Sequence, residues 1–87
     1  MDPADRRRII DEHQTHSGDS GSSEIQIALL TARIAGLTEH FRQHAHDHAG
    51  RRGLLQLVGQ RRRLLSYLSR ENTSRYREIV SRLSLRR

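Results

Sequence analysis

The sequence contains no cysteine, which excludes disulfides, a thiolate nucleophile and sulfur ligands for zinc. It also lacks tryptophan, and its only aromatic residues are one phenylalanine and two tyrosines. So few rings argue against a platform that binds bases by stacking. No apolar stretch approaches the roughly 20 residues of a membrane span, and the start MDPADRRRIIDE has no targeting-peptide character. We therefore expect a soluble, unexported chain with no membrane partner.

Lysine is absent too, so that all sixteen basic residues are arginine. Residues 1–50 have a net charge of −3, whereas residues 51–87 hold eleven arginines against two acidic residues, a net charge of +9. Such a polycationic half favours a nucleic acid partner over a merely solvated basic face. A module that binds DNA or acidic proteins and a purely structural bundle are the alternatives. No set of nucleophile, base and orienting group can be assembled, so we expect no enzyme.

The apolar residues, mainly leucine, isoleucine and alanine, recur at helical spacing, which predicts an all-α fold in one domain of 87 residues. Asp2 before Pro3 is typical of a helix start, and Ser22 or Ser23 is a cap for the next helix, with Gln26 placed for a capping box if Ser23 is used. The two long helices should form an antiparallel hairpin, which the last helix completes. The short first helix is expected to be mobile or protruding. The four helices are predicted at residues 3–13, 23–45, 49–70 and 73–84.

Two glycines, Gly53 and Gly59, fall inside the third predicted helix, where each costs about 1 kcal/mol relative to alanine. Close helix packing would explain them, and so would the close approach of a nucleic acid backbone.

The stretch EHFRQHAHDHAGRRG places His40, His44, His46 and His48 within nine residues, with Asp47 among them. His40 and His44 are one helical turn apart and could chelate a divalent ion. We expect at most adventitious metal binding there, and neither a native metal site nor a cofactor.

Three segments carry a resemblance to a known family: SGSSEIQIALLTARIAGLTEHF, HDHAGRRGLLQLVGQRRRLLSYL and RYREIVSRLSLRR. In this order and spacing, the chain resembles bacterial ribosomal protein fifteen of the small subunit over its whole length. The resemblance implies four helices, three of them in an antiparallel bundle. It implies a structural constituent of the small subunit, located in the cytoplasm with the ribosome and monomeric when free.

The resemblance also implies the partners. A member of this family binds directly and early to small-subunit ribosomal RNA, nucleates the platform of the subunit and contacts neighbouring small-subunit proteins. It contributes to a bridge with large-subunit ribosomal RNA, and some members repress their own messenger RNA by binding its leader.

Two RNA-binding surfaces follow from the family's motifs. The first grips a three-way RNA junction, and the matching positions here are Asp19, Ser20, Gly21, Gln26, Arg33, Arg63, Tyr67 and Arg70. The second enters a minor groove at a G·U/G·C step, and the matching positions are His40, Asp47 and Gly50, followed by Arg51 and Arg52.

This chain departs from the family at the second surface, where the usual HHSRRG reads HAGRRG. Gly50 therefore replaces a serine, and a backbone amide or a water would have to substitute for the hydroxyl, or discrimination would weaken by roughly 1 to 3 kcal/mol. Asp47 is expected to accept a hydrogen bond from a guanine amino group or a sugar hydroxyl, although it could also cap the third helix.

Overall fold

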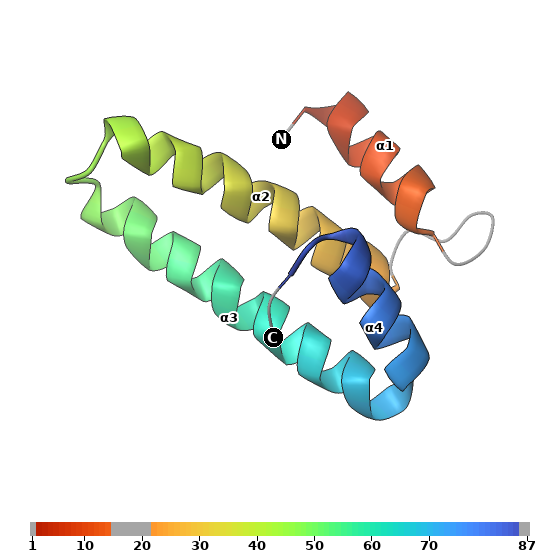
Figure 1. The fold of residues 1–87 in the computed structure, drawn as a ribbon. Coiled ribbons are helices and arrows are strands. Elements are labelled where there is room, and N and C mark those ends of the chain that lie inside the picture. Colours follow the sequence, from red (N-terminus) through yellow and green to blue (C-terminus); the bar gives the residue numbers. More distant parts are fainter. Residues whose placement is uncertain (1, 15–21, 86–87) are drawn as a thin grey trace.

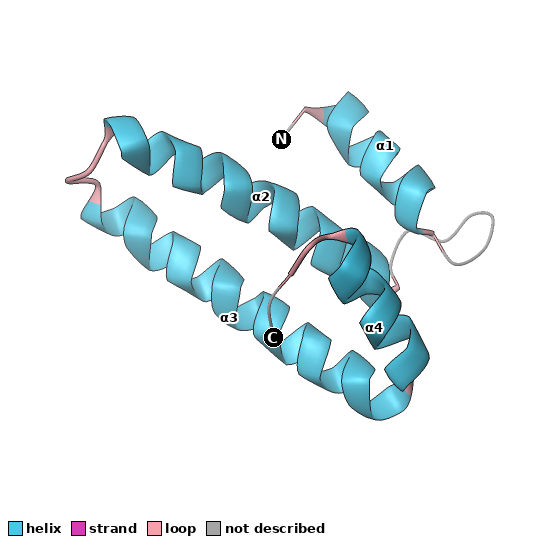
Figure 2. Cartoon of the chain, in the orientation of Figure 1, coloured by secondary structure: helices cyan, strands magenta, loops and turns pink. Residues whose placement is uncertain are grey.

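Four helices make up the computed structural model, which describes residues 2–14 and 22–85 (Figures 1 and 2). None of the described residues forms a strand, so the predicted all-α class is confirmed. The helices are α1 (Pro3–His13), α2 (Ser23–Gln43), α3 (His48–Glu71) and α4 (Thr73–Arg82).

Two of these helices end earlier than predicted. His44 leaves the helical conformation, with φ −129° and ψ 60°, so α2 stops at Gln43 and not at residue 45. At the other end of the chain, α4 stops at Arg82 instead of residue 84, and Ser84 takes up a positive φ of 53°.

The long helices α2 and α3 run antiparallel, and α4 turns back from the end of α3 across one half of this hairpin (Figure 1). The three helices meet in a core of Ile27, Leu68 and Ile79, each of which is at most 2% exposed. This core is completed by partly buried side chains from α3, α4 and the residues after it, namely Leu64, Leu65, Tyr76, Val80, Leu83 and Leu85. The turn between α2 and α3 projects beyond this core.

Serine and asparagine caps set where the bundle helices begin. Ser22 is the N-cap of α2, and its Oγ accepts a hydrogen bond from the backbone N–H of Ile25 at 3.4 Å. The capping box that Ser23 and Gln26 could form is therefore not the observed cap. Asn72 ends α3 and begins α4, and its Oδ1 accepts from the backbone N–H of Arg75 at 3.1 Å.

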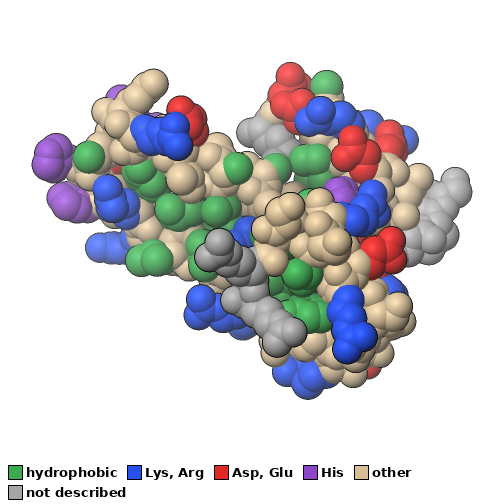
Figure 3. Space-filling view, in the orientation of Figure 1, with side chains coloured by type: hydrophobic (Ala, Val, Ile, Leu, Met, Phe, Trp, Pro, Cys, Tyr) green, Lys and Arg blue, Asp and Glu red, His purple; other side chains and the backbone are tan. Residues whose placement is uncertain are grey.

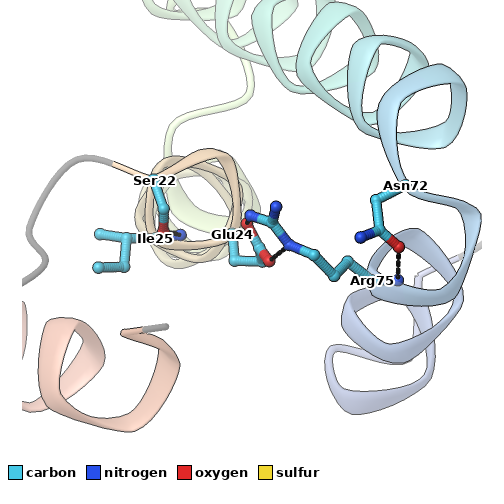
Figure 4. A network of polar contacts seen from close by, with 5 residues as sticks. All are labelled: Ser22, Glu24, Ile25, Asn72 and Arg75. Atoms are coloured by element: carbon cyan, nitrogen blue, oxygen red, sulfur yellow. Dashed lines mark hydrogen bonds and ion pairs between the residues drawn. The ribbon is translucent and has the colours of Figure 1, made fainter. Parts of the chain in front are cut away.

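A partly buried ion pair joins the start of α2 to the start of α4 (Figure 4). Glu24 is only 8% exposed and is the one charged residue classed as buried in the described part of the chain. Arg75 donates from Nε and Nη2 to the two carboxylate oxygens of Glu24. Asn72 caps α4 three residues before Arg75, so the cap sets the position of the helical turn that carries Arg75. From this turn the guanidinium group reaches Glu24 of α2.

The first helix, expected to be mobile or protruding, is docked in this structure. It packs against α2, and Ile10 is 6% exposed. Arg82 of α4 donates from Nη2 to the carbonyl oxygen of Glu12 at 2.9 Å, which ties down the C-terminal end of α1. Beside this contact, the pKa of His13 is lowered, first by burial and then by the positive charge of Arg82. The mobility of α1 stays a prediction.

Gly53 and Gly59 of α3 do not mark a close helix contact. A Cβ atom at Gly53 would have no described atom within 4 Å beyond its own stretch of helix, and at Gly59 the nearest would be Nη1 of Arg63 at 3.6 Å. Close helix packing is therefore wrong as the reason for these glycines. The approach of a nucleic acid backbone stays a prediction.

Replacing Arg75 should destabilise the bundle. In Arg75→Gln the buried carboxylate of Glu24 loses its charged partner, and we expect the free energy of unfolding to fall by about 2 kcal/mol. Arg77→Gln is the matched control, because Arg77 is an exposed arginine of the same helix, and its effect should stay within about 0.5 kcal/mol. Chemical denaturation of both variants measures this, and equal effects would show that the ion pair contributes nothing.

Acid should loosen α1. Because the pKa of His13 in the docked state lies below its ordinary value of 6.5, the docked state favours the neutral ring. The resulting stability is fully present above pH 6.5 and is lost as the pH falls toward the lowered value. Hydrogen exchange should show weaker protection of α1 amides at about pH 5.5 than at about pH 7.5, with α2 amides as internal reference. A His13→Gln variant should lose this difference; a difference that persists in it would contradict the assignment to His13.

Candidate nucleic-acid interface

A groove between α2 and α3 brings together three of the residues predicted to bind the RNA junction. Gln26 and Arg33 of α2 and Arg63 of α3 line one hollow of about 530 Å³. Gln26 and Arg33 are seven residues apart, so two helical turns place both on the same face of α2. The hollow has an apolar floor, and none of the described residues that line it is acidic, so these residues offer donors and positive charge.

Two further predicted residues continue this face along α3 toward its C-terminal end. Tyr67 and Arg70 follow Arg63 at helical intervals of four and three. Tyr67 is 49% exposed, and Arg70 is exposed and donates from Nη1 to Oγ of Ser66 at 3.0 Å. The last three predicted junction residues, Asp19, Ser20 and Gly21, lie outside the described residues.

Sequence reasoning missed Gln60, which also lines the groove. The sequence did indicate this position, because Gln60 lies three residues before Arg63 and that spacing places both residues on one helix face. In the structure, Arg61 is only partly exposed and donates from Nη1 to Oγ1 of Thr31 at 3.3 Å, which links α3 to α2.

The turn between α2 and α3 brings together His40, Asp47 and Gly50. Asp47 is the N-cap of α3, as the alternative interpretation held: its Oδ1 accepts from the backbone N–H of Gly50 at 2.9 Å. Its second oxygen, Oδ2, lies 3.1 Å from Nε2 of His40. The hydrogen bond from Gly50, followed by the one from His40, lowers the pKa of Asp47. Asp47 is thus held as a carboxylate whose two oxygens each have a protein donor.

The ring of His40 is held on two further sides. It stacks on His44, with centroids 4.4 Å apart and 22° between the planes, and it meets the edge of Phe41 at 5.4 Å. Arg51 lies over the Phe41 ring at 5.3 Å and donates from Nε to the carbonyl of Ala45 at 3.2 Å. The sequence had placed these two histidines one helical turn apart, and in the structure their rings stack. Arg52 is exposed.

Histidine and arginine side chains dominate this end of the molecule (Figure 3). Most of the visible histidine side chains gather at the turn, with arginines beside them, while the visible acidic side chains lie mainly over α1. Across the described residues, no group of three or more His, Cys, Asp or Glu is placed to hold a metal ion. None of the described helices combines the length and the apolar character that crossing a membrane requires.

The lowered pKa of Asp47 makes its contribution to stability depend on pH. A depressed pKa means that the ionised form stabilises the folded state above the ordinary value of 3.8, and that this stabilisation is lost as the pH falls through the lowered value. Denaturation of the wild type and of Asp47→Ala should therefore show the variant less stable at neutral pH, with the difference shrinking in acid. A difference that stays constant down to about pH 2 would contradict the role of the carboxylate.

Comparison with known proteins assigns the chain to a family. The sequence model of the family described as "Ribosomal protein S15" matches residues 6–86. A protein of Micrococcus luteus named "Small ribosomal subunit protein uS15" is 54% identical over 87 residues, which cover 100% of this chain and 98% of that protein. A protein of Kocuria rhizophila with the same name shows the same identity and coverage. The chain therefore belongs to the ribosomal protein S15 family, and it is a structural component of the ribosome in the cytoplasm and not an enzyme.

Proposed function

We propose that this chain is a constituent of the small ribosomal subunit that binds ribosomal RNA at two places. The groove between α2 and α3 takes a three-way junction, and the turn between the same helices takes a G·U/G·C step in a minor groove. The observation that carries this proposal is the convergence of Gln26, Arg33 and Arg63 on one groove, whose lining within the described part of the chain contains no acidic residue.

The chemistry of the groove suits folded RNA. At a junction, phosphates of several strands lie close together, and guanidinium groups on two facing helices can bind phosphates of different strands. Gln26 adds an amide that can both donate and accept a hydrogen bond, and Tyr67 adds an exposed ring beside the groove. The residues Asp19, Ser20 and Gly21 are assigned to the same contact from the family's motif alone.

The chemistry of the turn suits a minor groove. A-form RNA offers a wide, shallow minor groove with base edges and 2′-hydroxyl groups, which a compact turn can reach. His40 and Asp47 supply a ring nitrogen and a carboxylate at this turn, while Arg51 and Arg52 follow them on the first turn of α3 and can contact phosphates.

Both surfaces lie on one helical hairpin, so their separation is fixed. Gly50 and Arg63 are thirteen residues apart in α3, about 20 Å along the helix axis. RNA helices bound at both places would be held at a set angle, which is how one small RNA-binding domain can nucleate the platform of the subunit. The same proposal includes contacts with neighbouring proteins, a bridge to large-subunit ribosomal RNA and binding to the protein's own messenger RNA leader. It also includes a monomeric free state.

A salt-dependent titration tests this function. We expect tight binding to a small-subunit RNA fragment that holds the junction and the G·U/G·C step, and much weaker binding to a junctionless duplex. Arg63→Ala should weaken binding to the junction fragment and reduce the slope of log affinity against log salt by about 1, because one phosphate contact is lost. Arg77→Ala serves as the control, because Arg77 lies on α4 away from the groove.

Equal affinity for the two RNAs would contradict junction recognition and would mean that the arginines act as a general polycation. Equal changes of slope in Arg63→Ala and Arg77→Ala would contradict the assignment of the groove.

A further inference from the structure

We infer that Gly50 is a positioning residue for His40, because its missing side chain leaves the space in which Asp47 holds the histidine. A Cβ atom at position 50 would lie 2.5 Å from Oδ2 of Asp47, 2.9 Å from its Cγ and 3.1 Å from Cε1 of Phe41. Real Cβ atoms essentially never approach a heavy atom as closely as the first two distances. A side chain at position 50 and the observed position of the Asp47 carboxylate therefore exclude each other.

Space, and not backbone conformation, is what requires glycine here. The φ angle of Gly50 lies outside the left-handed region, and the residue sits in the first turn of α3, where other residues fit readily. Two other helical glycines, Gly36 and Gly53, would place a Cβ with no described atom within 4 Å beyond their own stretch of helix. The crowding is thus particular to position 50.

The atom in the way is the one that contacts His40. Oδ2 of Asp47 lies 3.1 Å from Nε2 of His40, while Oδ1 accepts from the backbone N–H of Gly50. Because Oδ2 is the end of a flexible side chain, a Cβ at position 50 would displace the carboxylate and leave the helix in place. The expected result is the loss of the contact between Asp47 and His40.

This contact decides which nitrogen of His40 faces a partner. An ionised carboxylate can only accept hydrogen bonds, so Nε2 of His40 must carry the proton that lies between them. In the neutral ring, Nδ1 is then an acceptor, and it has no hydrogen-bond partner among the described residues. Guanine amino groups and 2′-hydroxyl groups are the donors that an RNA minor groove presents.

This inference rests on the proposed function, because it names the group with which the turn would contact the RNA minor groove. The family's serine hydroxyl is missing from this chain, and the turn keeps a histidine acceptor whose tautomer is set by Asp47. Stacking on His44 and the edge of Phe41 hold the ring in place. Gly50 acts through Asp47 and need not touch the RNA.

The first test uses the free protein, so it does not depend on the proposed function. In the wild type, the ¹⁵N chemical shifts of His40 at about pH 8 should report a ring protonated at Nε2. Gly50→Ala and Gly50→Ser should both move these shifts toward a mixture of tautomers, since both add a Cβ atom. Gly36→Ala, a glycine replacement in α2 with open space around it, should leave the His40 shifts unchanged.

The second test measures binding to an RNA duplex that contains the G·U/G·C step without the junction, beside the same duplex without the step. The preference of the wild type for the step should fall about tenfold in Gly50→Ala, the scale of one lost base contact, and stay unchanged in Gly36→Ala. Asp47→Asn should have a similar effect. Its amide oxygen can still accept the hydrogen bond from the backbone N–H of Gly50, while its NH₂ group donates and so favours a His40 ring whose Nε2 is unprotonated.

A double-mutant cycle separates positioning from general damage. If Gly50 acts through His40, adding Gly50→Ala to a His40→Ala variant should not further reduce the preference for the duplex with the G·U/G·C step. An additional tenfold loss there, or unchanged His40 shifts in Gly50→Ala, would overturn the inference. A wild type that shows no preference for the step would contradict the minor-groove part of the proposed function, whereas the shifts of His40 would still decide whether Gly50 positions the ring.

Discussion

The contact among Ile27, Leu68 and Ile79 is the constraint on which the rest of the structure depends. It joins α2, α3 and α4 near one end of the long hairpin, and it is small, as expected for a chain of this length. This contact fixes which faces of α2 and α3 point into the core, and it therefore also fixes which faces are exposed. Arg33 and Arg63 therefore meet across one groove, and the opposite end of the hairpin is free to project as a turn.

Polar contacts at the helix ends serve both the fold and the candidate site. Asn72 begins α4 and so aims Arg75 at the buried Glu24, which ties α4 to the start of α2. Asp47 begins α3 with one oxygen and holds His40 with the other. The orientation of His40 in the turn is thus a consequence of helix capping.

The sequence predicted the parts of this structure that depend on local patterns. The stripes of leucine and isoleucine predicted four helices, and the place of Asp47 just before the third predicted helix offered it as a cap. Contacts between distant residues left no such pattern: Glu24 and Arg75 are 51 residues apart, and nothing near Glu24 indicates that it is buried. Close helix packing, one of the two explanations offered for Gly53, was wrong, and the crowding at Gly50 appears only once the position of Asp47 is known.

We propose that one rigid hairpin holds RNA at two separate places at once. Hydroxyl-radical footprinting of a small-subunit RNA fragment that carries both the junction and the G·U/G·C step tests this proposal. We expect two patches of protection that appear together at the same protein concentration, one at the junction and one in the minor groove. A single patch, or weak protection spread along every helix of the fragment, would contradict it.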